Sequence, residues 1–256
     1  CIPDVLRRVP AEQVIVECDP RLIPLMSRSF PGVTVRAASY EPAPSFVSTF
    51  QDFEFHIPCG SLPALFRPDL ASFQTSGPYL TADPELIQKY RRRLGNDFSN
   101  LRVGICWRSM LLDSNRNAHY APLSDWVDIL SQSGVTFVNL QYGDCKTELA
   151  SVSSHLDVFV NDWPDVDLKN DLEDVAAIIS GLDLVITAGT AVAELASALG
   201  QNVWVYMTEG NWGMLGQERY PWYPNCRTYI SRTANHSDSL GQIAADLKWL
   251  AQEKGA

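Results

Sequence analysis

The sequence predicts an α/β protein with two Rossmann-like parallel-sheet domains, the first of them incomplete at its N-terminus. Short apolar, β-branched segments alternate with amphipathic helix patterns, as in βαβ units. Residues 184–207 show the pattern most clearly, as a strand, a small-residue turn, a helix and another strand. We place the domain border in 95–100, which gives an N-terminal domain over residues 1–97 and a C-terminal domain over residues 98–256.

The first half alternates strands and helices before a polar helix that leads into the second domain. Asp19 is the predicted N-cap of a helix that begins with Pro20, and Asp83 precedes another helix start. In chain order we expect a helix over 2–9, a strand over 13–18, a helix over 20–30, a strand over 33–37, a loop over 40–48, a short strand over 53–57 and a helix over 83–95. The basic run in 89–93 indicates a solvated helix face or a rim between domains rather than an anion site.

The second half has a more regular pattern. We expect strands over 102–107, 135–142, 156–160, 184–187, 202–207 and 226–230, and helices over 122–131, 146–153, within 167–182, over 191–199 and over 237–253. A cluster of carboxylates, made of Asp167, Asp171, Glu173 and Asp174, lies at one of these helix starts. Helix capping explains the cluster better than metal binding does.

Composition and charge limit the partners. The chain has 256 residues, is 46% hydrophobic and carries a net charge of −10, which argues against nucleic acid or an anionic membrane surface as the main partner. No apolar run approaches the roughly 18 residues of a membrane span, and no secretory signal pattern is present. Six scattered cysteines without a C-x-x-C pair favour free thiols in a reducing compartment, so we predict a cytoplasmic protein. The four histidines stand too far apart for a zinc site, and we predict no bound metal.

Polar and small residues follow four strands of the second domain. Because ligands of open parallel sheets bind outside the carboxyl ends of the strands, we expect these residues to share one ligand site. The predicted donor-binding residues are Arg108, Ser109, Gln141, Tyr142, Thr187, Gly189, Thr190, Ala191, Glu194, Asn211 and Trp212. They suit a nucleotide, with Arg108 and the Gly189–Thr190 amides for phosphate, Tyr142 for a base and the loop groups for hydroxyls.

Two further residues near this edge have alternative interpretations. Glu194 either gains stability from the helix dipole, which we prefer, or accepts hydrogen bonds from sugar hydroxyls. His119 is either a solvated loop histidine, the commoner case, or a polar pocket residue. The sequence contains no G-x-x-x-x-G-K-[ST], G-x-G-x-x-G or G-x-S-x-G motif, so nucleotide hydrolysis, NAD chemistry and serine hydrolysis lack support.

Several segments together resemble a known family. They are VGICWRS, RNAHYAPL, TFVNLQYGDCKTEL, DLVITAGTAVAELASALG and RYPWYPNCRTY, in that order, with the earlier VECDPRLIPLMSRSFPG and IPCGSLP. The chain resembles the glycosyltransferase domain at the C-terminus of bacterial tetratricopeptide-repeat proteins. That domain is similar to heptosyltransferases and, more distantly, to protein O-linked N-acetylglucosamine transferases.

The resemblance implies a GT-B fold and transfer of a sugar from a nucleotide-activated donor to an acceptor, a protein or a surface glycan. It implies no cofactor and no metal, and it places the acceptor near Gly60 and Ser61. Heptosyltransferases carry an Asp and a His where this chain has Gly189 and Glu194, so side-chain contacts to donor at these two positions differ from that pattern. The family's glycine-rich loop with its GD pair, a source of the catalytic base, is expected upstream of residue 1, and we therefore assign no catalytic residue.

Two other functions stay open at this stage. A catalytically inactive GT-B-like binding or scaffold domain would also account for Gly189, Glu194 and the missing loop. A sugar-nucleotide epimerase shares the two-domain fold and would turn over nucleotide sugar without an acceptor.

Overall fold

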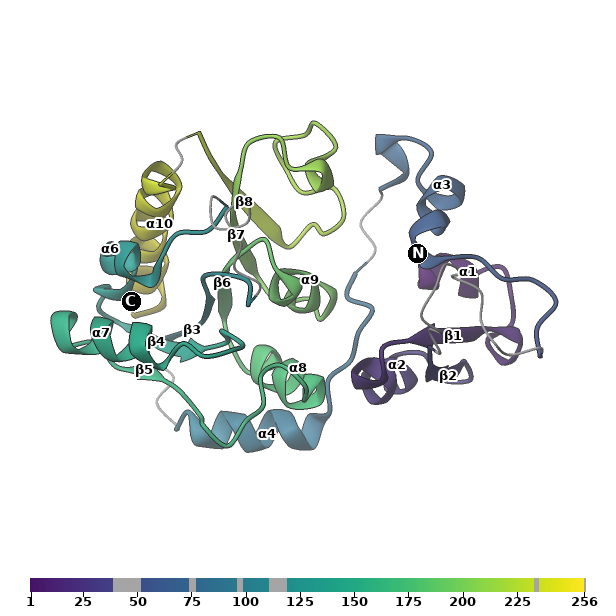
Figure 1. Ribbon diagram of the computed structural model, residues 1–256, viewed down its shortest axis with the longest axis horizontal. Coiled ribbons are helices and arrows are strands. Elements are labelled where there is room, and N and C mark those ends of the chain that lie inside the picture. The colour runs from purple at the N-terminus through teal and green to yellow at the C-terminus, as the bar shows by residue number, and fades with distance from the viewer. Residues whose placement is uncertain (39–51, 74–76, 96–98, 111–118, 233–234, 256) are drawn as a thin grey trace. The chain divides into compact units, whose positions relative to one another are not determined.

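The computed structural model describes residues 1–38, 52–73, 77–95, 99–110, 119–232 and 235–255 (Figure 1). The chain divides into two compact units, Cys1–Thr81 and Ala82–Ala256. This division lies before the border at residue 97 that we placed from the sequence, and residues 96–98 lie outside the described ranges. The predicted loop over 40–48 also lies outside them.

The first unit contains a small two-stranded parallel sheet. Its elements are α1 (Ile2–Leu6), β1 (Ile15–Cys18), α2 (Ile23–Ser29), β2 (Thr34–Ala37) and α3 (Leu62–Phe66). Ile15 lies opposite Thr34 in the ladder, and Val16, Met26 and Phe30 form the buried core of the unit. Asp19 accepts a hydrogen bond from the Arg21 amide at 3.0 Å and opens a 3₁₀ turn that leads into α2, as the sequence predicted.

The predicted strand over 53–57 is wrong. Those residues form no ladder with any described strand, and Phe55 and Ile57 are 89% and 44% exposed. Their apolar and aromatic composition favoured a strand, but β structure also needs a hydrogen-bonded neighbour, which the described residues do not supply. The small residues that follow, Cys59–Ser61, form a 3₁₀ turn directly before α3.

The second unit is built on a six-stranded parallel sheet with the order β5-β4-β3-β6-β7-β8. The strands are β3 (Leu101–Cys106), β4 (Val135–Asn139), β5 (Val160–Asn161), β6 (Leu184–Ala188), β7 (Val203–Thr208) and β8 (Cys226–Ser231). Every residue of the central pair β3 and β6 is buried, as expected for strands covered on both faces. Together with the parallel sheet of the first unit, this confirms the predicted α/β class.

Helices cover both faces of the six-stranded sheet (Figure 1). One layer contains α6 (Val127–Leu130), α7 (Lys146–Leu156) and α10 (Ser237–Gly255), and the other contains α4 (Pro84–Arg93), α8 (Leu172–Ser180) and α9 (Ala191–Ala198). In the described part of the chain no helix is both long and apolar enough to cross a membrane.

Helix α4, which we placed in the first domain, packs on α8 of the second unit. Tyr90 is fully buried and stacks on Trp163 with ring centroids 5.2 Å apart. Lys89 pairs with Asp174 at 3.4 Å, and Arg93 pairs with Asp165 at 2.8 Å. Two cations of the basic run therefore join α4 to the first turn of α8 and to the segment that precedes it.

Two helix starts follow the capping prediction, and one predicted strand is shifted. Asp83 caps α4, and Asp171 caps α8 by accepting from the Asp174 amide at 3.0 Å. The strand predicted over 156–160 begins only at Val160, because α7 continues to Leu156 and ends at Asp157, whose φ of 52° is left-handed. A left-handed residue ends a helix by turning the chain away from its axis.

Candidate ligand site at the carboxyl edge of the six-stranded sheet

The centre of the candidate site is the turn that joins β6 to α9. Thr190 is the N-cap of α9, and its Oγ1 accepts a hydrogen bond from the Val192 amide at 3.3 Å. The Thr187 hydroxyl donates to the Ala188 carbonyl at 2.8 Å and lies 3.4 Å from the Thr190 hydroxyl. Both threonines are buried, so their side chains shape the turn and leave its outer face to the backbone.

The outer face of this turn is open. Gly189 and Ala191 are exposed, and a Cβ added at Gly189 would meet nothing within 4 Å. Within the described residues, no hydrogen-bond acceptor meets the amides of Gly189, Thr190 and Ala191. Free amides at the positive end of a helix, with no side chain in the way, attract an anion such as phosphate.

Gln141 joins the loops that follow β3 and β4. Its Oε1 accepts from the amides of Trp107 and Arg108 at 3.1 and 3.0 Å, and its Nε2 donates to the carbonyls of Arg108 and Tyr142 at 2.9 and 3.0 Å. The side chain is 1% exposed, and all four of these bonds stay inside the protein. We predicted Gln141 as a donor-binding residue. In the structure its side chain holds the backbone of the two loops together, a link that we call the Gln141 clamp.

Cys106 connects this clamp to the α9 turn. Its Sγ lies 3.7 Å from both Gln141 Oε1 and Thr190 Oγ1. The thiol is fully buried, and burial raises its pKa to about 11. The predicted residues that follow β3, β4 and β6 therefore come together, with a protonated thiol packed between them.

Arg108 is paired with a carboxylate that we did not predict. Its Nε lies 3.1 Å from Glu148 Oε2, its Nη2 also contacts that carboxylate, and Nη2 donates to the Asp144 carbonyl at 2.9 Å. The hydrogen bond to Glu148 raises the pKa of Arg108, and the Trp107 indole donates to Glu148 Oε1 at 2.9 Å. The positive charge that we expected to face phosphate is thus balanced inside the protein.

Tyr142 and Ser109 lie on the same side of the α9 turn. Tyr142 is half-buried, and burial raises the pKa of its hydroxyl, while a hydrogen bond with Ser109 acts in the opposite direction. Gly143 has a φ of +87°, and a Cβ there would lie 3.0 Å from Met110 Cγ. The glycine therefore allows the β4 loop to approach the β3 loop closely.

The loop that follows β7 is tied to α9 through Glu194. The Tyr220 hydroxyl donates to Glu194 Oε1 at 2.7 Å, and burial beside this carboxylate raises the pKa of Tyr220. The same loop carries Asn211, whose side chain accepts from the Gly213 amide, and Trp212, which is 82% exposed. All the predicted donor-binding residues of the second unit thus lie at or beside the carboxyl edge of the sheet.

His119 reaches this edge through a long-range contact. Its Nδ1 lies 3.0 Å from Thr208 Oγ1, at the end of β7. The segment is fixed two residues later, where the Ala121 amide donates to the Tyr206 hydroxyl, which donates to the Trp107 carbonyl at 2.6 Å. Local sequence patterns could not predict this contact, because the two partners are 89 positions apart.

The predicted acceptor-side residues lie in the first unit. Gly60 and Ser61 are exposed in the 3₁₀ turn before α3, and a Cβ added at Gly60 would meet nothing within 4 Å. Their role stays a prediction. In the described part of the chain, no cluster of three or more His, Cys, Asp or Glu side chains could hold a metal ion.

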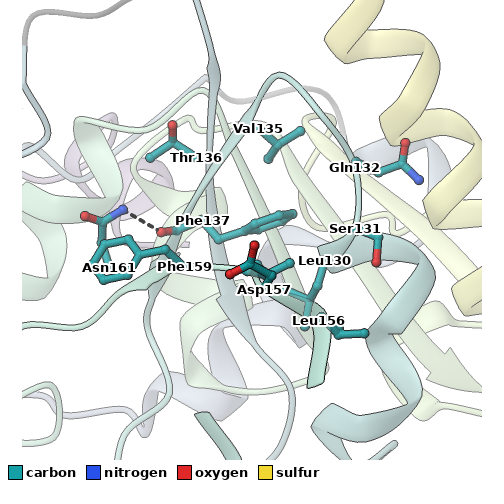
Figure 2. Close-up of a pocket in the computed structure, with 11 residues that line it drawn as sticks. Leu130, Ser131, Gln132, Val135, Thr136, Phe137, Leu156, Asp157, Phe159 and Asn161 are labelled. Atoms are coloured by element: carbon teal, nitrogen blue, oxygen red, sulfur yellow. Dashed lines mark hydrogen bonds between the residues drawn. The ribbon is translucent and has the colours of Figure 1, made fainter. Parts of the chain in front are cut away.

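A separate hollow of about 450 Å³ lies away from this edge (Figure 2). Its lining comes from the end of α6, the first half of β4 and the segment from Leu156 to Asn161 around β5. In this lining, Asn161 Nδ2 donates to the Phe137 carbonyl at 2.9 Å. Because these segments lie toward the amino ends of the strands, the hollow contains none of the predicted site residues.

Comparisons with known proteins give one sequence relative and a fold. Protein FlbA of Caulobacter vibrioides is 31% identical over 256 residues, which is 96% of this chain and 43% of that protein. The chain therefore spans less than half the length of this relative. No protein-family profile matches the chain.

The first solved structure that the chain resembles is a glycosyl transferase of family 9 from Veillonella parvula. It has a TM-score of 0.54 at 12% identity, over 70% of this chain and 55% of that one. The fold is GT-B-like. An Escherichia coli ADP-heptose heptosyltransferase II also matches, at 11% identity over 72% of this chain and 58% of that one, but its TM-score is 0.48 and the fold assignment rests on the first structure. In open parallel sheets of this kind, ligands bind outside the carboxyl ends of the strands.

Proposed function

We propose that the chain belongs to a glycosyltransferase and binds the nucleotide-activated donor from which the sugar is taken. The observation that carries this proposal is the open turn at Gly189–Ala191, where amides without a protein partner meet the N-terminus of α9. The GT-B-like fold agrees with it. Such a turn at the carboxyl edge of a parallel sheet suits the phosphate of a nucleotide.

The neighbouring residues suggest how the donor is held. The phosphate binds the amides of the α9 turn, and the base lies against Tyr142 on the β4 side. Sugar hydroxyls donate to Glu194, because Tyr220 occupies only one of its carboxylate oxygens among the described contacts. Ser109 and Asn211 supply further polar groups at the rim.

The leaving phosphate is stabilised without a metal in this proposal. Fixed amides at a helix N-terminus stabilise developing negative charge because they need no reorganisation during the reaction. His119 adds an imidazole at the end of β7. Arg108 stabilises the leaving phosphate only weakly, because Glu148 balances most of its charge. No described residue is assigned as the catalytic base, and no cofactor is required.

The acceptor and the setting are also proposed. We infer a protein or surface-glycan acceptor that approaches the turn at Gly60 and Ser61, and attachment to tetratricopeptide repeats in a bacterial, cytoplasmic protein. The resemblance to repeat-associated transferases described above supports this inference.

Isothermal titration with paired nucleotides and nucleotide sugars tests the proposal. We expect the chain to bind at least one pair, and Arg108→Ala to weaken that binding by a few-fold through its effect on the β3 loop. Absence of binding by every nucleotide and nucleotide sugar would contradict the proposed site, and unchanged binding by Arg108→Ala would remove Arg108 from it.

A binding or scaffold domain without transfer activity is the second candidate. The pairing of Arg108 with Glu148 favours it, because a neutralised guanidinium gives less help to a leaving phosphate. A radiolabelled donor distinguishes the two: release of free nucleotide in the presence of acceptor supports transfer, whereas tight binding with no turnover by the full-length protein supports the scaffold.

A further inference from the structure

Trp212 is an exposed indole on a firmly anchored turn. It lies in the 3₁₀ turn Trp212–Met214 of the β7–β8 loop, and its side chain is 82% exposed. The next two residues, Gly213 and Met214, are buried, and Met214 belongs to the core beneath α8 and α9. The indole is therefore held at the surface by a backbone that is fixed on both sides.

Three contacts fix this turn. Asn211 Oδ1 accepts from the Gly213 amide at 2.9 Å, and the Trp222 indole donates to the Gly213 carbonyl at 3.1 Å. A Cβ on Gly213 would lie 3.1 Å from the Tyr220 ring, so the turn packs closely against that ring. None of these contacts uses the Trp212 ring, so the ring is available for a ligand.

The turn is also connected to the proposed phosphate site. Tyr220, which packs against Gly213, donates to Glu194 in the first turn of α9. The strand order places β7 directly beside β6, and Ala188 pairs with Tyr206, so the β7 loop begins where the chain turns into α9. Tyr142 follows β4, on the other side of β6.

This order along the sheet edge assigns a part of the donor to Trp212. A nucleotide sugar has its phosphate between the base and the sugar. If the phosphate binds at the α9 turn and the base lies against Tyr142, the sugar falls on the β7 side, beside Glu194 and Trp212. An aromatic ring face attracts the apolar C–H face of a sugar ring, while nearby carboxylate and amide groups bind its hydroxyls.

We propose that Trp212 is the platform on which the sugar of the donor stacks, and that it determines preference for the sugar. This inference rests on the proposed function, since it assumes that a nucleotide sugar binds at this edge. It predicts that removing the Trp212 ring weakens binding of the nucleotide sugar and leaves binding of the bare nucleotide unchanged.

The test compares a bare nucleotide with its sugar conjugate in two tryptophan variants. The probe pairs are UDP with UDP-N-acetylglucosamine, GDP with GDP-mannose, ADP with ADP-glucose and CMP with CMP-N-acetylneuraminate. Trp249 is the matched control, because it is also exposed, at 62%, but lies on α10. Each Kd is measured by titration calorimetry for the unsubstituted chain, Trp212→Ala, Trp212→Phe and Trp249→Ala.

For the pair that binds the unsubstituted chain, we expect Trp212→Ala to weaken the nucleotide sugar about tenfold and to leave the bare nucleotide within about twofold. Trp212→Phe should recover most of the loss, and Trp249→Ala should change neither Kd. Equal losses for both members of the pair, or no loss for either, would overturn the role of Trp212 while leaving the proposed function intact. Absence of binding by every pair to the unsubstituted chain would overturn the proposed function itself, and the inference with it.

Discussion

The guanidinium of Arg108 lies against the carboxylate of Glu148, with Nε 3.2 Å from Oε1 and 3.1 Å from Oε2. The Arg108 side chain is 12% exposed and that of Glu148 is 31% exposed, so water screens the pair only in part. The pair joins the β3 loop to the first turn of α7 and fixes the wall of the site on that side.

Removing the carboxylate of this pair should destabilise the fold. We expect Glu148→Ala to lower the free energy of unfolding by about 1–2 kcal/mol, since it leaves a largely covered guanidinium and the Trp107 indole without their acceptor. Glu148→Gln keeps an acceptor for the indole and should cost less. Urea denaturation of Glu148→Ala, Arg108→Ala and the double variant measures the coupling energy between the two side chains. Glu148→Gln is measured in the same way. Additive effects of the two substitutions would show that the pair contributes nothing.

The same pair makes a prediction about ligand binding. Glu148→Gln removes the negative charge that balances Arg108, so we expect a bound nucleotide to gain affinity, by a few-fold at low salt. Calorimetric titration at two ionic strengths checks this, and the gain should shrink as salt rises. A weaker Kd at both salt concentrations would mean that Glu148 is needed to position the β3 loop.

A substitution at Gly189 should affect nucleotide binding without affecting the stability of the fold. Because a side chain there would enter open space, the free energy of unfolding of Gly189→Leu should lie within about 0.5 kcal/mol of that of the unsubstituted chain. It should nevertheless weaken nucleotide binding by tenfold or more, since the leucine would cover the free amides of the turn.

The control for Gly189 is a glycine in the core. A Cβ on Gly104 would lie 2.5 Å from Leu140 Cδ1 and 2.7 Å from Leu182 Cδ1, so Gly104→Ala should cost about 1–3 kcal/mol of unfolding free energy. Unchanged nucleotide affinity in Gly189→Leu would contradict the proposed phosphate site, whatever the stability data show.

Alkaline pH should destabilise the protein through its buried thiols. Burial raises the pKa of Cys106 from its ordinary 9.0 to about 11, so the unfolded chain loses this proton at lower pH than the folded one. The stability that the protonated thiol contributes is complete below pH 9 and is lost as pH rises from about 9 to about 11. Thermal unfolding from pH 8 to pH 11 should therefore show a falling Tm.

Two variants identify the thiols responsible. Cys106→Ala should reduce the fall of Tm with pH. Cys226→Ala should reduce it further, because burial raises the pKa of Cys226 to about 12. Cys59, which is exposed, is the control, and Cys59→Ala should leave the slope unchanged. An equal slope in Cys106→Ala and the unsubstituted chain would assign the alkaline loss to other groups.

Features that depend on nearby residues could be predicted from the sequence. The caps at Asp19, Asp83 and Asp171 follow from a short polar side chain before a helix pattern, and the β6–α9 turn follows from small residues between two regular patterns. Two of the predicted elements differ from the structure. Residues 53–57 have the composition of a strand, but no described strand pairs with them, and α7 continues beyond Ser153, where its apolar pattern ends.

The contacts of the site side chains could not be predicted in the same way. Glu148 lies 40 positions from Arg108, and His119 lies 89 positions from Thr208. Local patterns locate each residue at the end of a strand, but they do not say which charge will neutralise another once the strands are aligned. The sequence therefore located the edge of the sheet correctly and left open which of its side chains are free for a ligand.

The pairing of β3 with β6 has a consequence for how the chain folds. The Arg102 amide donates to the Asp183 carboxylate, 81 positions further along, and Val103 lies opposite Leu184. For β3 and β6 to pair, the chain must first close the long loop between them. The entropy lost in closing that loop is not offset until the contacts between the two strands form, and this slows folding. We expect the segments on either side, β3–β4 and β6–β7–β8, to form early as separate units and to join along β3 and β6 in the rate-limiting step.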